Sequence, residues 1–171
     1  MEIKKKQFNT VAVGGTFDEL HKGHKMLLKK AFQVGEHVIV GLSSDEFVAK
    51  MNKPHKTASY NERLEALTCF LEKAGYKNRF QISPLHDSYG LTLNKDKNID
   101  ALIVSQETVK ICEIINKKRV ETALPPLSII QISLVPAENK KPISTTLIHA
   151  NEIDKNGKIV KKNVFPAKSA S

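Results

Sequence analysis

Short continuous runs of apolar residues alternate along the chain with segments in which apolar residues recur every three or four positions. The apolar runs have the length of buried strands and lie at residues 9–16, 37–44, 79–85, 99–105 and 127–136. The segments with helical spacing lie at residues 22–35, 45–51, 59–75, 106–121 and 143–153. Strands that are apolar throughout and alternate with helices predict a parallel sheet covered on both faces. We therefore expect a single α/β domain, doubly wound around five parallel strands.

Local signals mark the ends of two of these helices. Ser59 and Glu62 have the spacing of a capping box, which predicts that a helix begins directly after Ser59. Gly35 and Gly75 follow the last apolar positions of their helices, so we expect each glycine to end its helix.

Polar residues outside this pattern fall mainly into two loops, residues 50–59 and 86–98, which are long enough to act as lids or binding loops. Arg63 follows the predicted capping box and is expected to pair at the surface with Glu62 or Glu65. We also expect three histidines to lie at the surface, namely His37, His55 and His86.

Composition narrows the class of protein. A chain of 171 residues fits one domain with a real core. No apolar run approaches the roughly 20 residues that span a bilayer, and the N-terminal residues MEIKKKQF lack the apolar segment of a secretory signal. Two cysteines without paired spacing, Cys69 and Cys112, are expected to be reduced, buried thiols. These features predict a cytoplasmic protein without a membrane partner.

The net charge of +9 is unevenly distributed. Residues 155–171 hold five lysines and no acidic residue, so we divide the chain into a domain at residues 1–157 and a basic tail at residues 158–171. The whole chain has three arginines, whereas base readout and bidentate phosphate contacts favour arginine. We therefore expect no nucleic-acid partner, and the positive charge suits a small anionic substrate.

The residues VAVGGTFDELHKGHKMLLKKA, at positions 11–31, run from a strand through two glycines into a helix. A glycine turn lets the backbone approach a ligand closely, and the start of a helix directs free N–H groups at an anion. His21 and His24 share one side of the helix start, and Thr16 faces the same point. Backbone N–H groups, two imidazoles and a hydroxyl together suit a polyphosphate, although neither a P-loop nor a dinucleotide fingerprint is present. Surface or capping histidines, and a metal pair without a third ligand, are the alternatives.

Two stretches carry a resemblance to a known superfamily. The residues GGTFDELHKGHKMLL resemble the G-T-F-D-x-x-H-x-G-H signature of the nucleotidyltransferases with a Rossmann-like fold, and PISTTLI, at 142–148, resembles their second signature. DSYGLT, LIVSQET and INKKR then resemble the archaeal and eukaryotic branch of the phosphopantetheine adenylyltransferases. The resemblance covers about residues 10–157.

The chain departs from the pattern of that branch at several positions. Leu91 replaces a proline, and Lys110 and Ile111 stand where a glycine is usual. Leu147 and His149 occupy the arginine positions of a motif that commonly reads I-S-S-T-R-I-R. Each missing arginine removes a possible bidentate phosphate contact.

The resemblance implies transfer of AMP from ATP to 4′-phosphopantetheine, which gives dephospho-coenzyme A and pyrophosphate in coenzyme A biosynthesis. His24 would stabilise charge on the α-phosphate and Thr16 would orient the attacking phosphate. Lys53, rather than Lys50, would neutralise the transferring group. The implied ATP-binding residues are Gly14, Gly15, Thr16, Phe17, His21, His24, Ser144, Thr145 and Thr146. Among them, Gly14, Gly15 and Phe17 would approach the nucleotide with their backbone.

The resemblance also implies Mg²⁺ that bridges phosphate oxygens mainly through water, with no metal site of the protein's own. Two alternatives are a sister adenylyltransferase that acts on FMN or nicotinamide mononucleotide and a nucleotide-binding homologue without catalysis. A cytidylyltransferase is less favoured, because ENKKP stands where such enzymes usually carry R-T-x-G.

Overall fold

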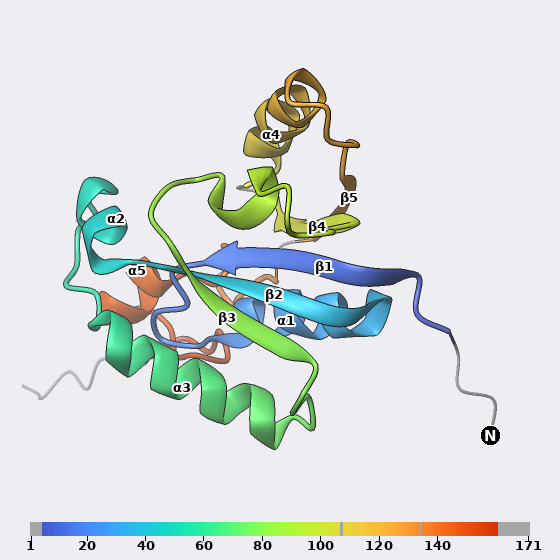
Figure 1. Ribbon diagram of the computed structural model, residues 1–171. Helices are drawn as coiled ribbons and strands as arrows, with labels where there is room; N and C mark the ends of the chain where they lie inside the picture. Colours follow the sequence, from blue (N-terminus) through green and yellow to red (C-terminus); the bar gives the residue numbers. More distant parts are fainter. Residues whose placement is uncertain (1–4, 107, 134, 161–171) are drawn as a thin grey trace, which may run out of the picture.

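Five parallel strands form the central sheet of the computed structural model, which describes residues 5–106, 108–133 and 135–160 (Figure 1). The strands are β1 (Phe8–Gly15), β2 (Gly35–Ser43), β3 (Phe80–Leu85), β4 (Ala101–Ser105) and β5 (Ser128–Ile132). They lie in the order β3-β2-β1-β4-β5. The predicted doubly wound, Rossmann-like sheet is confirmed.

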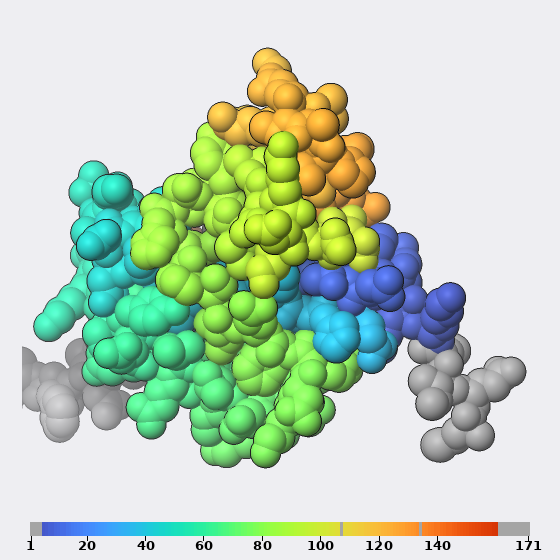
Figure 2. Space-filling view, in the orientation of Figure 1, coloured from blue at the N-terminus to red at the C-terminus, as the bar shows by residue number. Residues whose placement is uncertain are grey.

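Helices cover both faces of this sheet. They are α1 (Lys22–Val34), α2 (Asp45–Lys50), α3 (Tyr60–Lys73), the 3₁₀ helix η1 (Gly90–Leu93), α4 (Val109–Glu121) and α5 (Thr145–His149). Helices α1 and α3 pack on one face, and α4 and η1 pack on the other (Figure 1). In the space-filling view, the segment that follows β3 covers the middle of the face turned to the reader (Figure 2). The described part of the chain has no helix both long and apolar enough to cross a bilayer.

The helix boundaries follow local chemistry. Ser59 and Glu62 form the predicted capping box at the start of α3. Gly35 both caps α1 and begins β2, as predicted. A glycine fits here because a Cβ at this position would lie 2.6 Å from the side chain of Val11. Helix α4 begins at Val109, later than predicted, because the Thr108 hydroxyl accepts a hydrogen bond from the Ser105 N–H and holds a turn there.

The last helix is shorter than predicted. Ser144 caps α5, and Asn151 adopts a positive φ of 53° just beyond its end, so the helix does not reach residue 153. Residues 158–160 of the expected tail bond back onto this region through the Lys158 and Val160 N–H groups. Residues 161–171 lie outside the described part of the chain.

The sheet opens where the crossovers change direction, at the carboxyl ends of β1 and β4. β1 pairs with β2 as far as Gly15, whereas its pairing with β4 ends at Val13 opposite Ile103. Ligands of open α/β sheets bind at such a switch point. Gly14 and Gly15 therefore extend beyond the β4 pairing, next to the position expected for a ligand.

Candidate active site

A cavity of about 910 Å³ lies at the carboxyl ends of β1 and β4. This volume lies within the usual range for small-molecule sites. All predicted site residues except Phe17 line it, namely Gly14, Gly15, Thr16, His21, His24, Lys53, Ser144, Thr145 and Thr146. Three segments that are distant in the sequence thus meet around one space.

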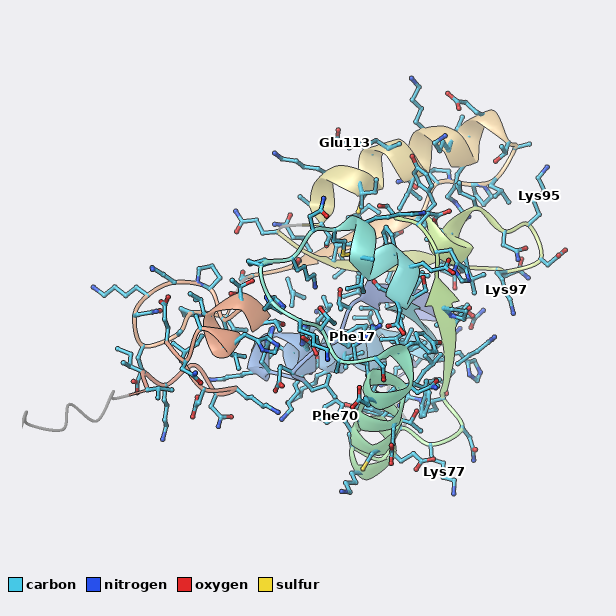
Figure 3. All side chains as sticks on the ribbon, turned by 90° about the vertical axis from the view of Figure 1, so that its left-hand side faces the viewer. Phe17, Phe70, Lys77, Lys95, Lys97 and Glu113 are labelled. Atoms are coloured by element: carbon cyan, nitrogen blue, oxygen red, sulfur yellow. The ribbon has the colours of Figure 1, made fainter. Side chains whose placement is uncertain are left out.

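Phe17 supports the site from within the core. Its side chain is 1% exposed, and its ring centroid lies 5.3 Å from that of His24. Figure 3 shows Phe17 in the interior, whereas Lys77, Lys95 and Lys97 project from the edge of the molecule. A contact between Phe17 and a nucleotide would therefore involve its backbone.

His21 caps helix α1 with its imidazole ring. Its Nδ1 accepts hydrogen bonds from the N–H groups of Gly23, at 3.1 Å, and His24, at 3.4 Å. Burial lowers the pKa of His21 to about 4. Since Nδ1 must stay unprotonated to accept, the neutral ring carries its hydrogen on Nε2, which is left as a donor.

His24 stacks on His21, with ring centroids 3.7 Å apart and an angle of 20° between the planes. Burial, followed by the charges of His21 and Lys53, lowers the pKa of His24 to about 3. Its Nδ1 is buried without a hydrogen-bond partner among the described residues. The ring is thus neutral near pH 7, and an anion bound beside it would favour its protonation.

These two histidines make the stability of the protein depend on pH. Both folded-state pKa values lie below the usual 6.5, so the unfolded chain binds more protons between pH 6.5 and pH 4. We expect the free energy of unfolding to fall with decreasing pH by up to about 1.4 kcal/mol per unit for each histidine. Urea denaturation at pH 7 and pH 5 measures this slope.

Two variants test the assignment. His21→Asn keeps an N-cap acceptor and should reduce the slope, because one of the two titrating rings is gone. His86→Asn should leave the slope unchanged, because His86 is exposed. An unchanged slope in His21→Asn would contradict the role of His21.

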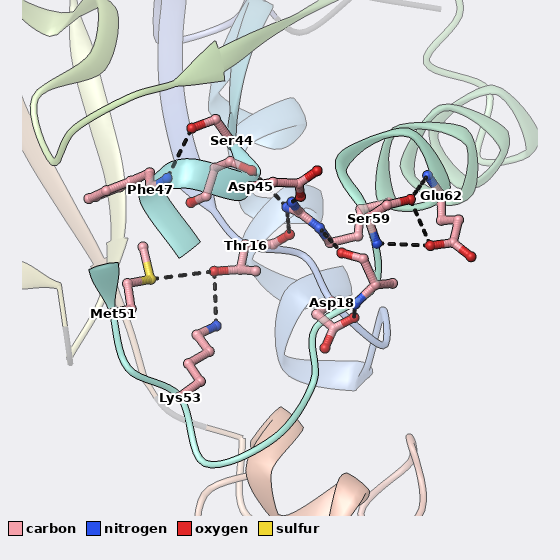
Figure 4. A network of polar contacts seen from close by, with 12 residues as sticks. Thr16, Asp18, Ser44, Asp45, Phe47, Met51, Lys53, Ser59 and Glu62 are labelled. Atoms are coloured by element: carbon pink, nitrogen blue, oxygen red, sulfur yellow. Dashed lines mark hydrogen bonds and ion pairs between the residues drawn. The ribbon is translucent and has the colours of Figure 1, made fainter. Parts of the chain in front are cut away.

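Lys53 brings a positive charge to the turn after β1. Its Nζ donates a hydrogen bond of 3.0 Å to the hydroxyl oxygen of Thr16, which also lies 3.9 Å from the sulfur of Met51 (Figure 4). Lys50 is exposed on α2 and does not line the cavity. Of the two lysines considered from the sequence, the structure therefore places Lys53 at the site.

Helix α5 is held against the same turn. The Thr145 hydroxyl donates to the backbone carbonyl of Asp18 at 3.1 Å, and the Ser144 hydroxyl accepts from the Leu147 N–H. Thr146 lines the cavity beside them. These contacts bring the second signature opposite the histidines, although more than a hundred residues separate the two in sequence.

The expectation for Arg63 is wrong. Its side chain is buried, and its guanidinium donates to the backbone carbonyls of Thr16, Ser43 and Ala58 and to the carboxylate of Asp45. Arg63 therefore joins the turn after β1 to β2 and α3. Helical spacing alone could not reveal this, because the acceptors are backbone groups of other segments.

The expectation of a surface position is also wrong for His55. Its side chain is 9% exposed and stacks on His149, with ring centroids 4.4 Å apart. Two residues of α4 that match the adenylyltransferase pattern bond to the protein's own backbone. The side chain of Asn116 bonds to the backbone of Leu127. The guanidinium of Arg119 donates to the carbonyls of Pro125 and Thr92.

An apolar arm of the cavity had no signal in the sequence. It is lined by Leu85, Tyr89, Leu91, Ile111 and Ile114, from β3, the loop after it and α4. The loop at residues 86–98 was predicted only as a polar binding loop. Its apolar residues turn inward because η1 packs them against α4.

Comparisons with known proteins agree with this geometry. Residues 12–151 match the family described as cytidylyltransferase-like. The chain is 42% identical to the phosphopantetheine adenylyltransferase of Pyrococcus furiosus, and the match covers 92% of this chain and 98% of that protein. It is 44% identical to the phosphopantetheine adenylyltransferase of Thermococcus gammatolerans, and the match covers 93% of this chain and 99% of that protein. A crystal structure of a protein with unknown function from Archaeoglobus fulgidus has a TM-score of 0.64 and 30% identity, over 72% of this chain and 88% of that one.

Proposed function

Because the chain belongs to the cytidylyltransferase-like family and, within it, to the phosphopantetheine adenylyltransferases, we propose that it transfers AMP from ATP to 4′-phosphopantetheine. The products would be dephospho-coenzyme A and pyrophosphate, and the reaction is a step of coenzyme A biosynthesis. One observation carries the proposal: the glycine turn, the two stacked histidines, Lys53 and the hydroxyls before and in α5 line one cavity. Cys112 is buried as expected, whereas Cys69 is exposed, so the expectation of a buried thiol is wrong for Cys69. An exposed free thiol suits a reducing compartment, and we place the reaction in the cytoplasm.

In the proposed reaction, the triphosphate lies between the start of α1 and the start of α5. The Nε2–H of His21 and the ring of His24 face it from one side. Ser144, Thr145 and Thr146 line the other side. The hydroxyls of Ser144 and Thr146 are the side-chain donors there, because the Thr145 hydroxyl donates to the Asp18 carbonyl. Preorganised donors of this kind stabilise the charge that develops during phosphoryl transfer.

Thr16 and Lys53 would orient the acceptor. An oxygen of the acceptor phosphate forms a bond to the α-phosphorus while the bond to the bridging oxygen breaks, and the electron pair leaves with pyrophosphate. No residue of the protein becomes covalently attached. Catalysis then depends on positioning, which is worth ~7–11 kcal/mol in favourable cases, and on the charge of Lys53 beside the Thr16 hydroxyl.

The side chains that line the cavity indicate how Mg²⁺ would be bound. Among the described residues that line the cavity, Asp87 is the one acidic side chain, and the others near the histidines offer imidazole, ammonium and hydroxyl groups. Such a set fits phosphate better than a bare Mg²⁺ ion. We therefore propose that Mg²⁺ enters with ATP, is held mainly by phosphate oxygens and water, and neutralises charge on the phosphates.

The apolar arm supports the choice of acceptor. Leu85, Tyr89 and Leu91 line the same cavity as the phosphate-facing residues. The arm of 4′-phosphopantetheine is flexible, and its methyl and methylene groups would pack against these side chains.

The test is release of pyrophosphate from ATP in the presence of 4′-phosphopantetheine, with the product identified by mass. We expect turnover with this acceptor and little with FMN or nicotinamide mononucleotide. Turnover only with one of the latter two would overturn the choice of acceptor. Binding of ATP in a calorimeter, with no transfer to any acceptor, would instead support a homologue without catalysis.

A further inference from the structure

Asp18, His55 and His149 form a compact cluster next to the proposed site. One ligand atom of each lies within 4.8 Å of the others. The Nε2 of His149 lies 3.1 Å from Oδ2 of Asp18, and the Nε2 of His55 lies 3.9 Å from the same oxygen. The two rings stack at an angle of 17°. Both imidazoles thus present the same nitrogen to one buried carboxylate.

His55 is not satisfied by the protein. Both of its ring nitrogens are buried without a hydrogen-bond partner among the described residues. Buried polar groups nearly always have a partner, so an unpartnered imidazole calls for a ligand. Asp18 is 1% exposed, and its carboxylate has two partners, the Ala58 N–H at 3.3 Å and the Nε2 of His149 at 3.1 Å.

We propose that Asp18, His55 and His149 bind a divalent transition-metal ion of the zinc or cobalt class. Two imidazole nitrogens and one carboxylate oxygen suit these ions, with a fourth position left for water. Ligand atoms around a tetrahedral zinc ion lie about 3.4 Å apart, and the ion lies in the plane of each imidazole ring that binds it. The two stacked rings must therefore turn apart to share one ion, and His149, whose side chain is 30% exposed, has room to turn. Mg²⁺ prefers oxygen ligands and would compete poorly.

The charge of the cluster suits a cation, because the buried Asp18 carboxylate supplies a negative charge for the ion. His149 supplies the third ligand atom, at a position where the resembling motif has an arginine.

The ion would join three segments that build the cavity. Asp18 follows the turn after β1, His55 lies in the loop that carries Lys53, and His149 ends α5. The Asp18 carboxylate already accepts a hydrogen bond from the Ala58 N–H in that loop. Binding of the metal would therefore hold the Lys53 loop against α5, independently of which acceptor the enzyme uses.

The full-length protein, freed of metal by EDTA and transferred to chelator-free buffer, tests the site without substrate. We expect one equivalent of Co²⁺ to give visible d–d absorption bands, Zn²⁺ to displace it, and excess Mg²⁺ to leave the bands unchanged. His149→Arg and His55→Ala should lose the bands, while the exposed control His86→Ala keeps them. Circular dichroism checks that each variant is folded.

A second readout is thermal. Zn²⁺ should raise the Tm of the parent protein and of His86→Ala but not of His149→Arg, which keeps a positive charge beside Asp18 without a metal ligand. Failure of the parent protein to bind Co²⁺ or Zn²⁺ would overturn the proposal. Equal binding by both His55→Ala and His149→Arg would do so too, because the ion would then lie elsewhere.

Discussion

Replacement of His24 by alanine is expected to lower kcat for adenylyl transfer by about 10²–10³-fold, the usual cost of removing one preorganised donor. The ring lines the cavity, and the N-cap of α1 does not depend on it, because His21 provides that cap. Steady-state pyrophosphate release at saturating ATP measures kcat. Calorimetry should still detect ATP binding, because His21 and the hydroxyls near α5 remain.

The matched control is His86→Ala, which removes an exposed histidine outside the cavity lining. This control should keep both kcat and the melting temperature of the parent protein. His24→Ala loses ring packing against His21 and Phe17, so circular dichroism must show that it is folded at the assay temperature. A kcat for His24→Ala within about twofold of the parent value would remove His24 from the reaction. A large rise in KM with unchanged kcat would instead assign His24 to ground-state binding.

The fold could be predicted because its signals are local. Apolar runs, helical spacing and the Ser59–Glu62 capping box each depend on a few neighbouring residues, and the five strands appear where the apolar runs lie. Boundaries were less accurate where a side chain contacts a nearby backbone group. The Thr108 hydroxyl contacts the Ser105 N–H just before α4 begins, and Asn151 has a positive φ just after α5 ends. Periodicity reports neither feature.

The cavity residues were predicted from a resemblance and not from spacing alone. The histidine pair by itself left a metal pair, a cap and a phosphate site open. The structure shows that a capping role and a position in the cavity coexist in His21. The resemblance grouped Phe17 with Gly14 and Gly15 as a backbone contact of the nucleotide, and the position of its ring in the core leaves the backbone as the group that could make this contact.

The errors at His55 and Arg63 have a common physical cause. Each polar side chain is buried by segments distant in sequence: His149 covers His55, and backbone groups after β1 and β2 surround Arg63. Polar residues are mostly exposed, so a single sequence favours the surface for them. Burial of this kind becomes visible only when the segments are assembled.

Replacement of Arg63 by methionine is expected to lower the free energy of unfolding by about 3–5 kcal/mol. Methionine fills much of the same space but leaves the carbonyls of Thr16, Ser43 and Ala58 without their donor. Each buried acceptor left unpaired costs about 1–3 kcal/mol. Urea denaturation at pH 7 measures the change.

Asp45→Asn separates the two parts of this network. Asp45 is the exposed partner of Arg63, so loss of its charge should cost at most about 1 kcal/mol. A loss in Asp45→Asn as large as that in Arg63→Met would show that the ion pair, and not the carbonyl contacts, holds Arg63. Arg63→Lys should fall between the two, because a single ammonium cannot reach every acceptor that the guanidinium does.

The stability change should extend to catalysis, because the Thr16 carbonyl that Arg63 holds belongs to the residue whose hydroxyl accepts from Lys53 (Figure 4). Without that anchor, Thr16 and Lys53 lose their fixed separation across the proposed acceptor site. At a temperature where Arg63→Met is still folded, we therefore expect a lower kcat in addition to lower stability. Asp45→Asn should keep kcat near the parent value, since the carbonyl contacts of Arg63 remain intact.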